Sequence, residues 1–170
     1  GSVCSLQEIM NKQNWDKVVI KPTLSAGAYQ TFVADRNTIY DSNEKFNALV
    51  LKRSVLVQKF AEEIISKGEL SLMYFNKKYS HTVVKRAKHG DFRIQTEYGG
   101  SYHAYYPSDE LLEQVDGILF KISDQLLYAR IDGYLDAMEN FHLMEVELIE
   151  PVLFFDNNPH AAEFFFKAFH

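Results

Sequence analysis

The chain has 170 residues, which is within the range of one domain and enough to bury a substantial core. Hydrophobic residues make up 46% and charged residues 24%, as in an ordinary globular protein, and the net charge of −5 argues against a general nucleic-acid-binding surface. The single cysteine, Cys4, excludes an internal disulfide and the usual cysteine zinc sites. No signal peptide or membrane-spanning apolar run is visible, and we expect a cytoplasmic protein with no membrane partner.

Short apolar runs separated by polar turns dominate the first 60 residues. They predict strands at residues 18–20, 29–34 and 55–60. A loop of small residues, at 23–28, lies between the first two strands. Asp41, with Glu44 three residues later, suggests a capping box. It would open a helix that ends near Arg53.

The rest of the chain alternates hairpin and helix patterns. Strands are predicted at residues 69–75, 79–85, 93–98, 127–133 and 142–149. The first two of these form one hairpin through residues 76–78, and the last two form another. Ser108 is a suitable N-cap for a helix whose apolar residues recur at helical spacing as far as Ile122, and a Phe-rich helix begins at residues 157–159.

The order of these elements indicates the fold class. Hairpins mixed with helices predict an α+β fold rather than alternating parallel βαβ units. We expect a first lobe over residues 1–57 and a larger second lobe over residues 58–170. No repeat or low-complexity segment appears.

Charged residues alternate with apolar ones on the last predicted hairpin. Because side chains alternate across a strand, Arg130 and Asp132 share one face, and so do Glu145 and Glu147 on the next strand. If the strands pair, three carboxylates and one guanidinium gather on one side of the sheet. Their mutual repulsion favours a counter-cation, and Mg²⁺ prefers such oxygen ligands. The alternative, which the pattern alone favours, is a solvated strand face.

Three more basic residues stand where they could meet phosphate. Lys21 ends the first strand ahead of the loop at residues 23–28, whose backbone N–H groups could cradle phosphates. Lys85 could neutralise phosphate charge, and Arg93 is suited to bidentate contact with phosphate or carboxylate. A surface lysine before a turn and a surface salt bridge are the alternatives for Lys21 and Arg93.

Taken in order, these pieces resemble the ATP-grasp superfamily, especially bacterial glutathione synthetases, D-alanine–D-alanine ligases and cycloserine-synthase-like ligases. The resemblance covers roughly residues 18–156. The stretches that carry it, besides Lys21 and the last hairpin, are Gly68-Glu69-Leu70-Ser71, Ser80-His81 with Lys85, and Asp91-Phe92-Arg93 with Gly99-Gly100. It implies an α+β ATP-grasp fold that holds ATP between its two lobes.

The resemblance also implies a role for individual residues. Phosphate contacts would come from Lys21, Lys85 and the covering loop Ser25, Ala26 and Gly27. Adenine would contact mainly the backbone of the hinge strand at Gln58, Lys59 and Phe60, and ribose would contact Glu69. The phosphoryl group or acyl intermediate would be oriented by Arg93 and Arg130.

The metal ligands of the family are an Asp on one strand and a Glu-x-Asn on the next, with a Pro four residues further on. Asp132, Glu145, Glu147 and Pro151 fit that spacing, so the resemblance implies that the three carboxylates hold one or two Mg²⁺. Glu147 stands where Asn is commoner, and either residue supplies oxygen to Mg²⁺.

The implied function is a Mg-ATP-dependent ligase that joins a small-molecule carboxylate to an amine or thiol through an acylphosphate. Family members usually carry an upstream substrate domain and an opening helix of the ATP-binding domain, and we expect both to be absent from this sequence, or only residues 5–12 to remain. Gly1-Ser2 is typical of a cloning remnant, so we expect a longer natural chain. Two alternatives stay open: a nucleotide-binding module without ligase activity, and an α+β protein whose charged hairpin is only surface. A homo-oligomer is also open.

Overall fold

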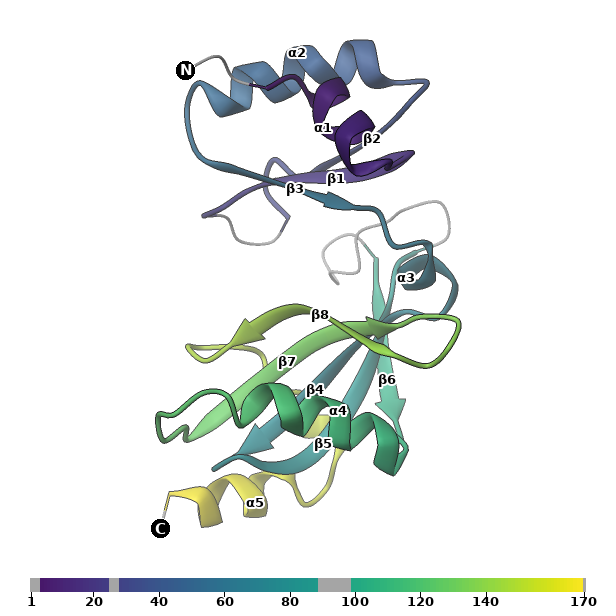
Figure 1. Cartoon of the computed structure of the whole chain (residues 1–170). Coiled ribbons are helices and arrows are strands. Elements are labelled where there is room, and N and C mark those ends of the chain that lie inside the picture. The colour runs from purple at the N-terminus through teal and green to yellow at the C-terminus, as the bar shows by residue number, and fades with distance from the viewer. Residues whose placement is uncertain (1–3, 25–27, 89–98, 170) are drawn as a thin grey trace. The chain divides into compact units, whose positions relative to one another are not determined.

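The computed structural model describes residues 4–24, 28–88 and 99–169. The chain divides into two compact units, Gly1–Ala61 and Glu62–His170, and each combines an antiparallel sheet with helices (Figure 1). The α+β class expected from the sequence is therefore confirmed. Among the described residues, no helix has the length and apolar character needed to cross a membrane.

The first unit is a sheet with helices on one face (Figure 1). Its strands lie in the order β2 (Phe32–Asp35), β1 (Lys17–Pro22) and β3 (Val55–Lys59), and its helices are α1 (Leu6–Gln13) and α2 (Ile39–Val50). Every second residue of β1 is buried, so Val18 and Ile20 pack in the core beneath the helices. Lys21, which alternates with them, is on the opposite face of the sheet.

Helix α2 begins earlier than its sequence indicates. Its N-cap residue is Thr38, which makes no side-chain capping bond, and Asp41 lies inside the first turn. The cause is Asp35, whose carboxylate accepts hydrogen bonds from the backbone N–H groups of Asn37 and Thr38 at 2.8 and 2.9 Å. This tight turn starts the helix ahead of Asp41. The predicted capping box at Asp41 is therefore wrong.

The second unit is built on a larger antiparallel sheet. Its strands lie in the order β6 (Ser101–Tyr105), β5 (Lys78–Arg86), β4 (Glu69–Phe75), β7 (Tyr128–Leu135) and β8 (Phe141–Glu147). The helical segments are α3 (Glu62–Ser66), α4 (Asp109–Leu119), the 3-10 turn η2 (Phe155–Asn157) and α5 (Ala161–Ala168).

Both faces of the central strand β4 are covered, because each of its residues is buried. On one face, Leu70, Leu72 and Tyr74 pack with the apolar side of α4. On the other face, Phe75 stacks on Phe155 and meets the edge of Phe165 from α5. The Phe-rich tail is thus a docked helix over one end of this face, and the remainder of the face carries the charged side chains of β4, β5, β7 and β8.

Most of the predicted elements of the second unit are confirmed. The hairpins β4–β5 and β7–β8 both form, with Asn76 and Lys77 at positive φ in the first turn. Ser108 caps α4 by accepting a hydrogen bond from the backbone N–H of Leu111 at 3.3 Å. Strand β6 was not predicted, and the strand predicted at residues 93–98 lies outside the described residues.

Candidate functional site

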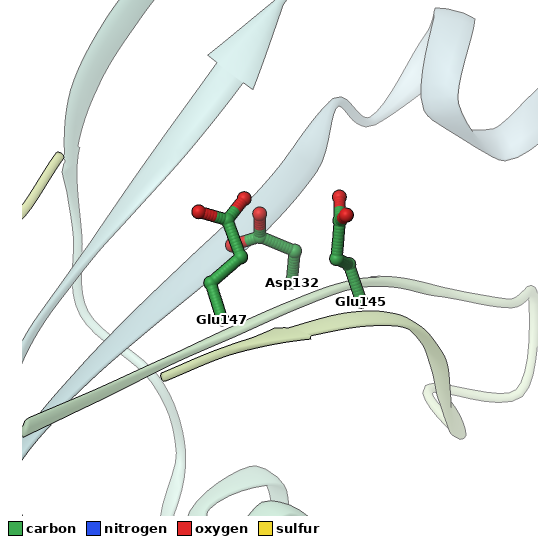
Figure 2. Close-up of side chains that lie close together, drawn as sticks. All are labelled: Asp132, Glu145 and Glu147. Carbon is green, nitrogen blue, oxygen red and sulfur yellow. The ribbon is translucent and has the colours of Figure 1, made fainter. Parts of the chain in front are cut away.

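The pairing of β7 with β8 brings together the carboxylates that the sequence singled out. Arg130 is opposite Glu147, and Asp132 is opposite Glu145. Figure 2 shows the three carboxylates on the same side of the strands, and one oxygen from each lies within 4.8 Å of the others. The predicted clustering of Asp132, Glu145 and Glu147 is therefore observed. Three oxygens at this separation are a suitable donor set for a hard divalent cation such as Mg²⁺.

Gly133 permits the close approach of the two strands beside Asp132. The register of the β7–β8 pair shifts between Asp132 and Gly133. A Cβ atom at Gly133 would collide with the backbone oxygen of His142 and the ring of Phe141. A glycine at this irregularity lets the chain bend without a clash, and it sets the position of the carboxylate that precedes it.

Asp132 is the centre of the site, with only 2% of its surface exposed. Arg130 donates to both of its oxygens, from Nε to Oδ1 at 3.0 Å and from Nη2 to Oδ2 at 2.9 Å. Ser71 Oγ donates to Oδ1 at 2.6 Å, and Lys85 Nζ lies 3.3 Å from Oδ2. A buried carboxylate with this many donors is held in one orientation.

Lys85 joins a fourth carboxylate to the cluster. Its Nζ lies 2.5 Å from Glu69 Oε1 and 3.3 Å from Asp132 Oδ2, so it bridges two acidic groups. Arg130 plays the same part on the other side, because its Nη2 contacts both Asp132 and Glu147. The four carboxylates thus face two cations, which leaves a formal excess of two negative charges in this group.

That excess charge raises the affinity of the cluster for a cation. Burial raises the pKa of Glu69, and the nearby Asp132 adds to the effect while Lys85 opposes it. Burial also raises the pKa of the Glu147 carboxyl, with further contributions from Asp132 and Glu145. Both raised pKa values mean that the ionised forms of these carboxylates are unfavourable in their surroundings, and a divalent cation nearby would stabilise them. The donor chemistry and the charge of the cluster therefore fit Mg²⁺.

The segment after β8 is fastened to this face by Arg130 and His81. Arg130 Nη1 donates to Val152 O at 3.2 Å, and its guanidinium lies 5.9 Å from the ring centre of Phe154. His81 Nε2 lies 3.0 Å from Leu153 O and 3.2 Å from Phe154 O. Since a carbonyl only accepts, Nε2 carries the proton. Nδ1 lies 2.9 Å from Ser80 Oγ, and it accepts from that hydroxyl in the neutral imidazole, which the lowered pKa of His81 favours.

The neutral state of His81 predicts a loss of stability in mild acid. Burial lowers the pKa of His81 below its usual value of about 6.5. The unfolded chain then takes up a proton at this histidine more readily than the folded chain does. The contribution of His81 to the free energy of unfolding is therefore fully present above pH 6.5, and it is lost as the pH falls through the lowered pKa. The expected loss is up to about 1.4 kcal/mol per pH unit in that window.

Urea unfolding at pH 8 and pH 5.5 measures this effect. The His81→Gln protein should lose less stability between the two pH values than the wild type, and the same change at the exposed His103 should leave the pH dependence unaltered. A His81→Gln protein with the wild-type pH dependence would contradict the neutral assignment.

The remaining candidates lie in the first unit or outside the described residues. Lys21 is on β1, and Gln58 and Lys59 are at the end of β3, paired with that strand. Phe60 is buried, with Lys17 Nζ 3.7 Å from its ring centre. The loop Ser25, Ala26 and Gly27 and the residue Arg93 lie outside the described residues. The roles given to all these residues stay predictions.

Two participants in the charged cluster were not identified as such from the sequence. Ser71 was only part of a motif, although its position two residues after Glu69 on one strand places both on the same face. Glu69 was expected to bind ribose, and the structure places it against Lys85 and beside Asp132. Its ribose role stays a prediction.

Comparisons with known proteins point to one fold. No protein-family model matches the sequence, and the comparison with curated proteins gave no match. Among solved structures, the chain resembles D-cycloserine synthetase DcsG, with 19% identity, a TM-score of 0.79, and coverage of 96% of this chain and 58% of that one. It also resembles a D-alanine–D-alanine ligase from Bacillus anthracis complexed with ATP (18%, TM-score 0.62, coverage 95% and 50%).

A third similar structure is the ATP-grasp ligase PsnB complexed with a phosphomimetic variant of its minimal precursor, Mg and ADP. It has 14% identity and a TM-score of 0.64, with coverage of 96% of this chain and 50% of that one.

These three structures show the fold of the chain, which is the ATP-grasp fold expected from the sequence. It spans little more than half the length of the solved structures that it matches. All of these neighbours are named as ligases or synthetases, and two of them were solved with ATP or with Mg and ADP.

Proposed function

We propose that the chain is the ATP-binding portion of a Mg²⁺-dependent ligase that joins a carboxylate to an amine or thiol. The observation that carries this proposal is the trio Asp132, Glu145 and Glu147, whose oxygens lie within 4.8 Å of one another on paired strands of an ATP-grasp fold. These carboxylates would hold Mg²⁺, which would supply positive charge to neutralise the ATP phosphates.

The proposed reaction has two steps. A substrate carboxylate oxygen attacks the γ-phosphorus of ATP, the bond from that phosphorus to the β–γ bridging oxygen breaks, and ADP leaves with the bonding electron pair. The amine or thiol then attacks the carbonyl carbon of the acylphosphate, loses its proton, and expels inorganic phosphate. Such phosphoryl transfers depend mainly on positioning and charge neutralisation.

The side chains of the second unit supply that neutralisation. Lys85 is a mobile point charge that can exchange its contact with Asp132 for a phosphate oxygen while it remains near Glu69. Arg130 keeps Asp132 and Glu147 in place, and we propose that it also faces the transferring phosphoryl group. From the resemblance, Lys21 and the loop Ser25, Ala26 and Gly27 would contact phosphates, and Arg93 would orient the intermediate.

The proposed substrates are small carboxylates and amines of amino-acid or peptide type. The names of two similar structures, a D-cycloserine synthetase and a D-alanine–D-alanine ligase, refer to products of this size. The macrocyclase MdnC, another similar structure, was solved with the precursor peptide MdnA, so we extend the proposed class to peptides. We propose a cytoplasmic location for the protein, because the proposed reaction consumes ATP.

A second candidate function is a nucleotide-binding module without ligase activity. This function needs only the carboxylate trio and its neighbouring cations, which suit Mg-nucleotide, and it needs no site for an acceptor substrate. Phosphate release in the presence of candidate carboxylates and amines separates the two functions. Release that requires both substrates supports the ligase, whereas nucleotide binding without release supports the module.

Thermal unfolding with a non-hydrolysable ATP analogue tests the shared part of both proposals. A ligand at 100 times its Kd adds about 2.7 kcal/mol of stability. We therefore expect the melting temperature to rise by several degrees with Mg²⁺ and the analogue together, and much less with either alone. No shift with the combination, at millimolar concentrations of both, would contradict nucleotide binding by this chain.

A further inference from the structure

Ser71 is a buried hydroxyl at the base of the carboxylate trio. It lies on the central strand β4, where it is directly opposite Asp132 in the register of β4 with β7, and none of its surface is exposed. Its Oγ lies 2.6 Å from Asp132 Oδ1. The serine hydroxyl donates this bond to the carboxylate oxygen, and its short length is typical of a hydrogen bond from an O–H group to a carboxylate.

The hydrogen bond from Ser71 restricts the terminal torsion of the Asp132 side chain. The terminal torsion of an Asp side chain is broad, so a carboxylate attached to a fixed strand can still rotate. Arg130 holds the carboxylate from one direction, and Lys85 contacts Oδ2 at the longer distance of 3.3 Å. Ser71 approaches Oδ1 from β4, so Arg130 and Ser71 together clamp the group from two neighbouring strands.

Ser71 differs from the charged partners of Asp132, Arg130 and Lys85, because it is a neutral donor. Lys85 is shared with Glu69, and Arg130 is shared with Glu147, so both cations redistribute when charges nearby change. Among the described residues, the Ser71 hydroxyl is hydrogen-bonded to Asp132 alone. A neutral donor can hold a metal-ligating carboxylate without repelling the metal, in contrast to the two cations.

We propose that Ser71 is a positioning residue that orients Asp132 for the divalent cation of the ATP site. This inference rests on the proposed function, because it presupposes that Asp132 is a metal ligand. Ser71 does not touch the cation or the nucleotide in this account, and it acts through the Asp132 carboxylate alone.

Mn²⁺ binding measured by electron paramagnetic resonance tests the proposal without any need for activity. Ser71→Ala should raise the Kd for Mn²⁺ by about 10-fold or more, the usual effect of removing a group that supports a metal ligand. Ser71→Thr, which retains the hydroxyl, should bring the Kd back to within about threefold of the wild type. If Ser71→Ala does not fold, Ser71→Cys is the second variant, because a thiol is only a weak donor.

Ser80→Ala is the matched control. Ser80 is a buried serine on the neighbouring strand β5, and its hydroxyl bonds His81 rather than Asp132. Its replacement should leave the Kd for Mn²⁺ within about twofold of the wild type, although it removes a comparable buried hydrogen bond. All titrations are carried out well below the melting temperature of each variant.

The outcomes separate the inference from the function on which it rests. If the wild type binds Mn²⁺ and Asp132→Asn does not, while Ser71→Ala or Ser71→Cys binds it as tightly as the wild type, Ser71 has no positioning role. An equal loss in Ser80→Ala would also overturn the inference. If the wild type itself binds no Mn²⁺, the proposed metal site fails and the role of Ser71 fails with it.

Discussion

Replacing Arg130 with methionine should lower the free energy of unfolding by about 3–5 kcal/mol, the usual cost of removing one partner from a buried ion pair. The Arg130 side chain is 11% exposed and contacts both Asp132 and Glu147. Without it, the buried Asp132 and the partly buried Glu147 remain in a group that already has excess negative charge. The substitution also removes the bond to Val152 O that fastens the segment after β8.

Urea unfolding of the metal-free protein measures this effect, and Arg36→Met is its control. Arg36 pairs with Asp16 at 2.7 Å, but the two side chains are 48% and 87% exposed, so the loss there should be below about 1 kcal/mol. Saturating Mg²⁺ should restore part of the stability of Arg130→Met, because the cation replaces some of the missing positive charge. Equal small losses in the two variants would mean that the cluster does not depend on Arg130.

Replacing Lys85 with methionine should separate nucleotide binding from metal binding. We expect the affinity for Mg-ATP to fall by about 10- to 100-fold, because a charge-assisted hydrogen bond is worth about 1.5–3 kcal/mol. The affinity for Mn²⁺ alone should not fall, since Lys85 contributes positive charge next to the proposed metal ligands. Glu69 would lose its partner, and its pKa, which burial already raises, would rise further because Lys85 no longer opposes the shift.

Fluorescence titration with a labelled ATP analogue and a separate Mn²⁺ titration measure the two affinities. Lys67→Met is the matched control, because Lys67 pairs with Glu139 at 2.7 Å on the exposed tip of the β7–β8 hairpin. It should change neither affinity. A parallel loss of both affinities in Lys85→Met would show that Lys85 only maintains the cluster and does not contact phosphate.

The carboxylate trio could be predicted from the sequence because it depends on two local rules. Alternation along a strand placed Arg130 with Asp132 and Glu145 with Glu147, and the short separation of the two strands made a hairpin the simplest pairing. The register then followed closely enough for all the carboxylates to meet. The structure adds the irregularity at Gly133, which the sequence did not reveal.

The rest of the cluster depends on strand order, which no local rule supplies. Strand β4 lies between β5 and β7, so Ser71 meets Asp132 across 61 residues of sequence and Lys85 meets the same carboxylate across 47. The motif around Glu69 indicated a ligand but not that its carboxylate would be buried against Lys85. The start of α2 was misplaced for a similar reason, since it is set by the carboxylate of Asp35 in the preceding turn.

Calorimetric titration of Mg-ATP into the wild type and Asp132→Asn tests the central claim that this carboxylate cluster binds the metal of Mg-ATP. Asp136→Asn, at an acidic residue outside the trio, is the control. We expect saturable binding to the wild type and to Asp136→Asn that is abolished by EDTA. We also expect an affinity for Asp132→Asn that is lower by on the order of 100-fold, which corresponds to about 2.7 kcal/mol. Unchanged Mg-ATP affinity in Asp132→Asn, or binding to the wild type that EDTA leaves intact, would contradict it.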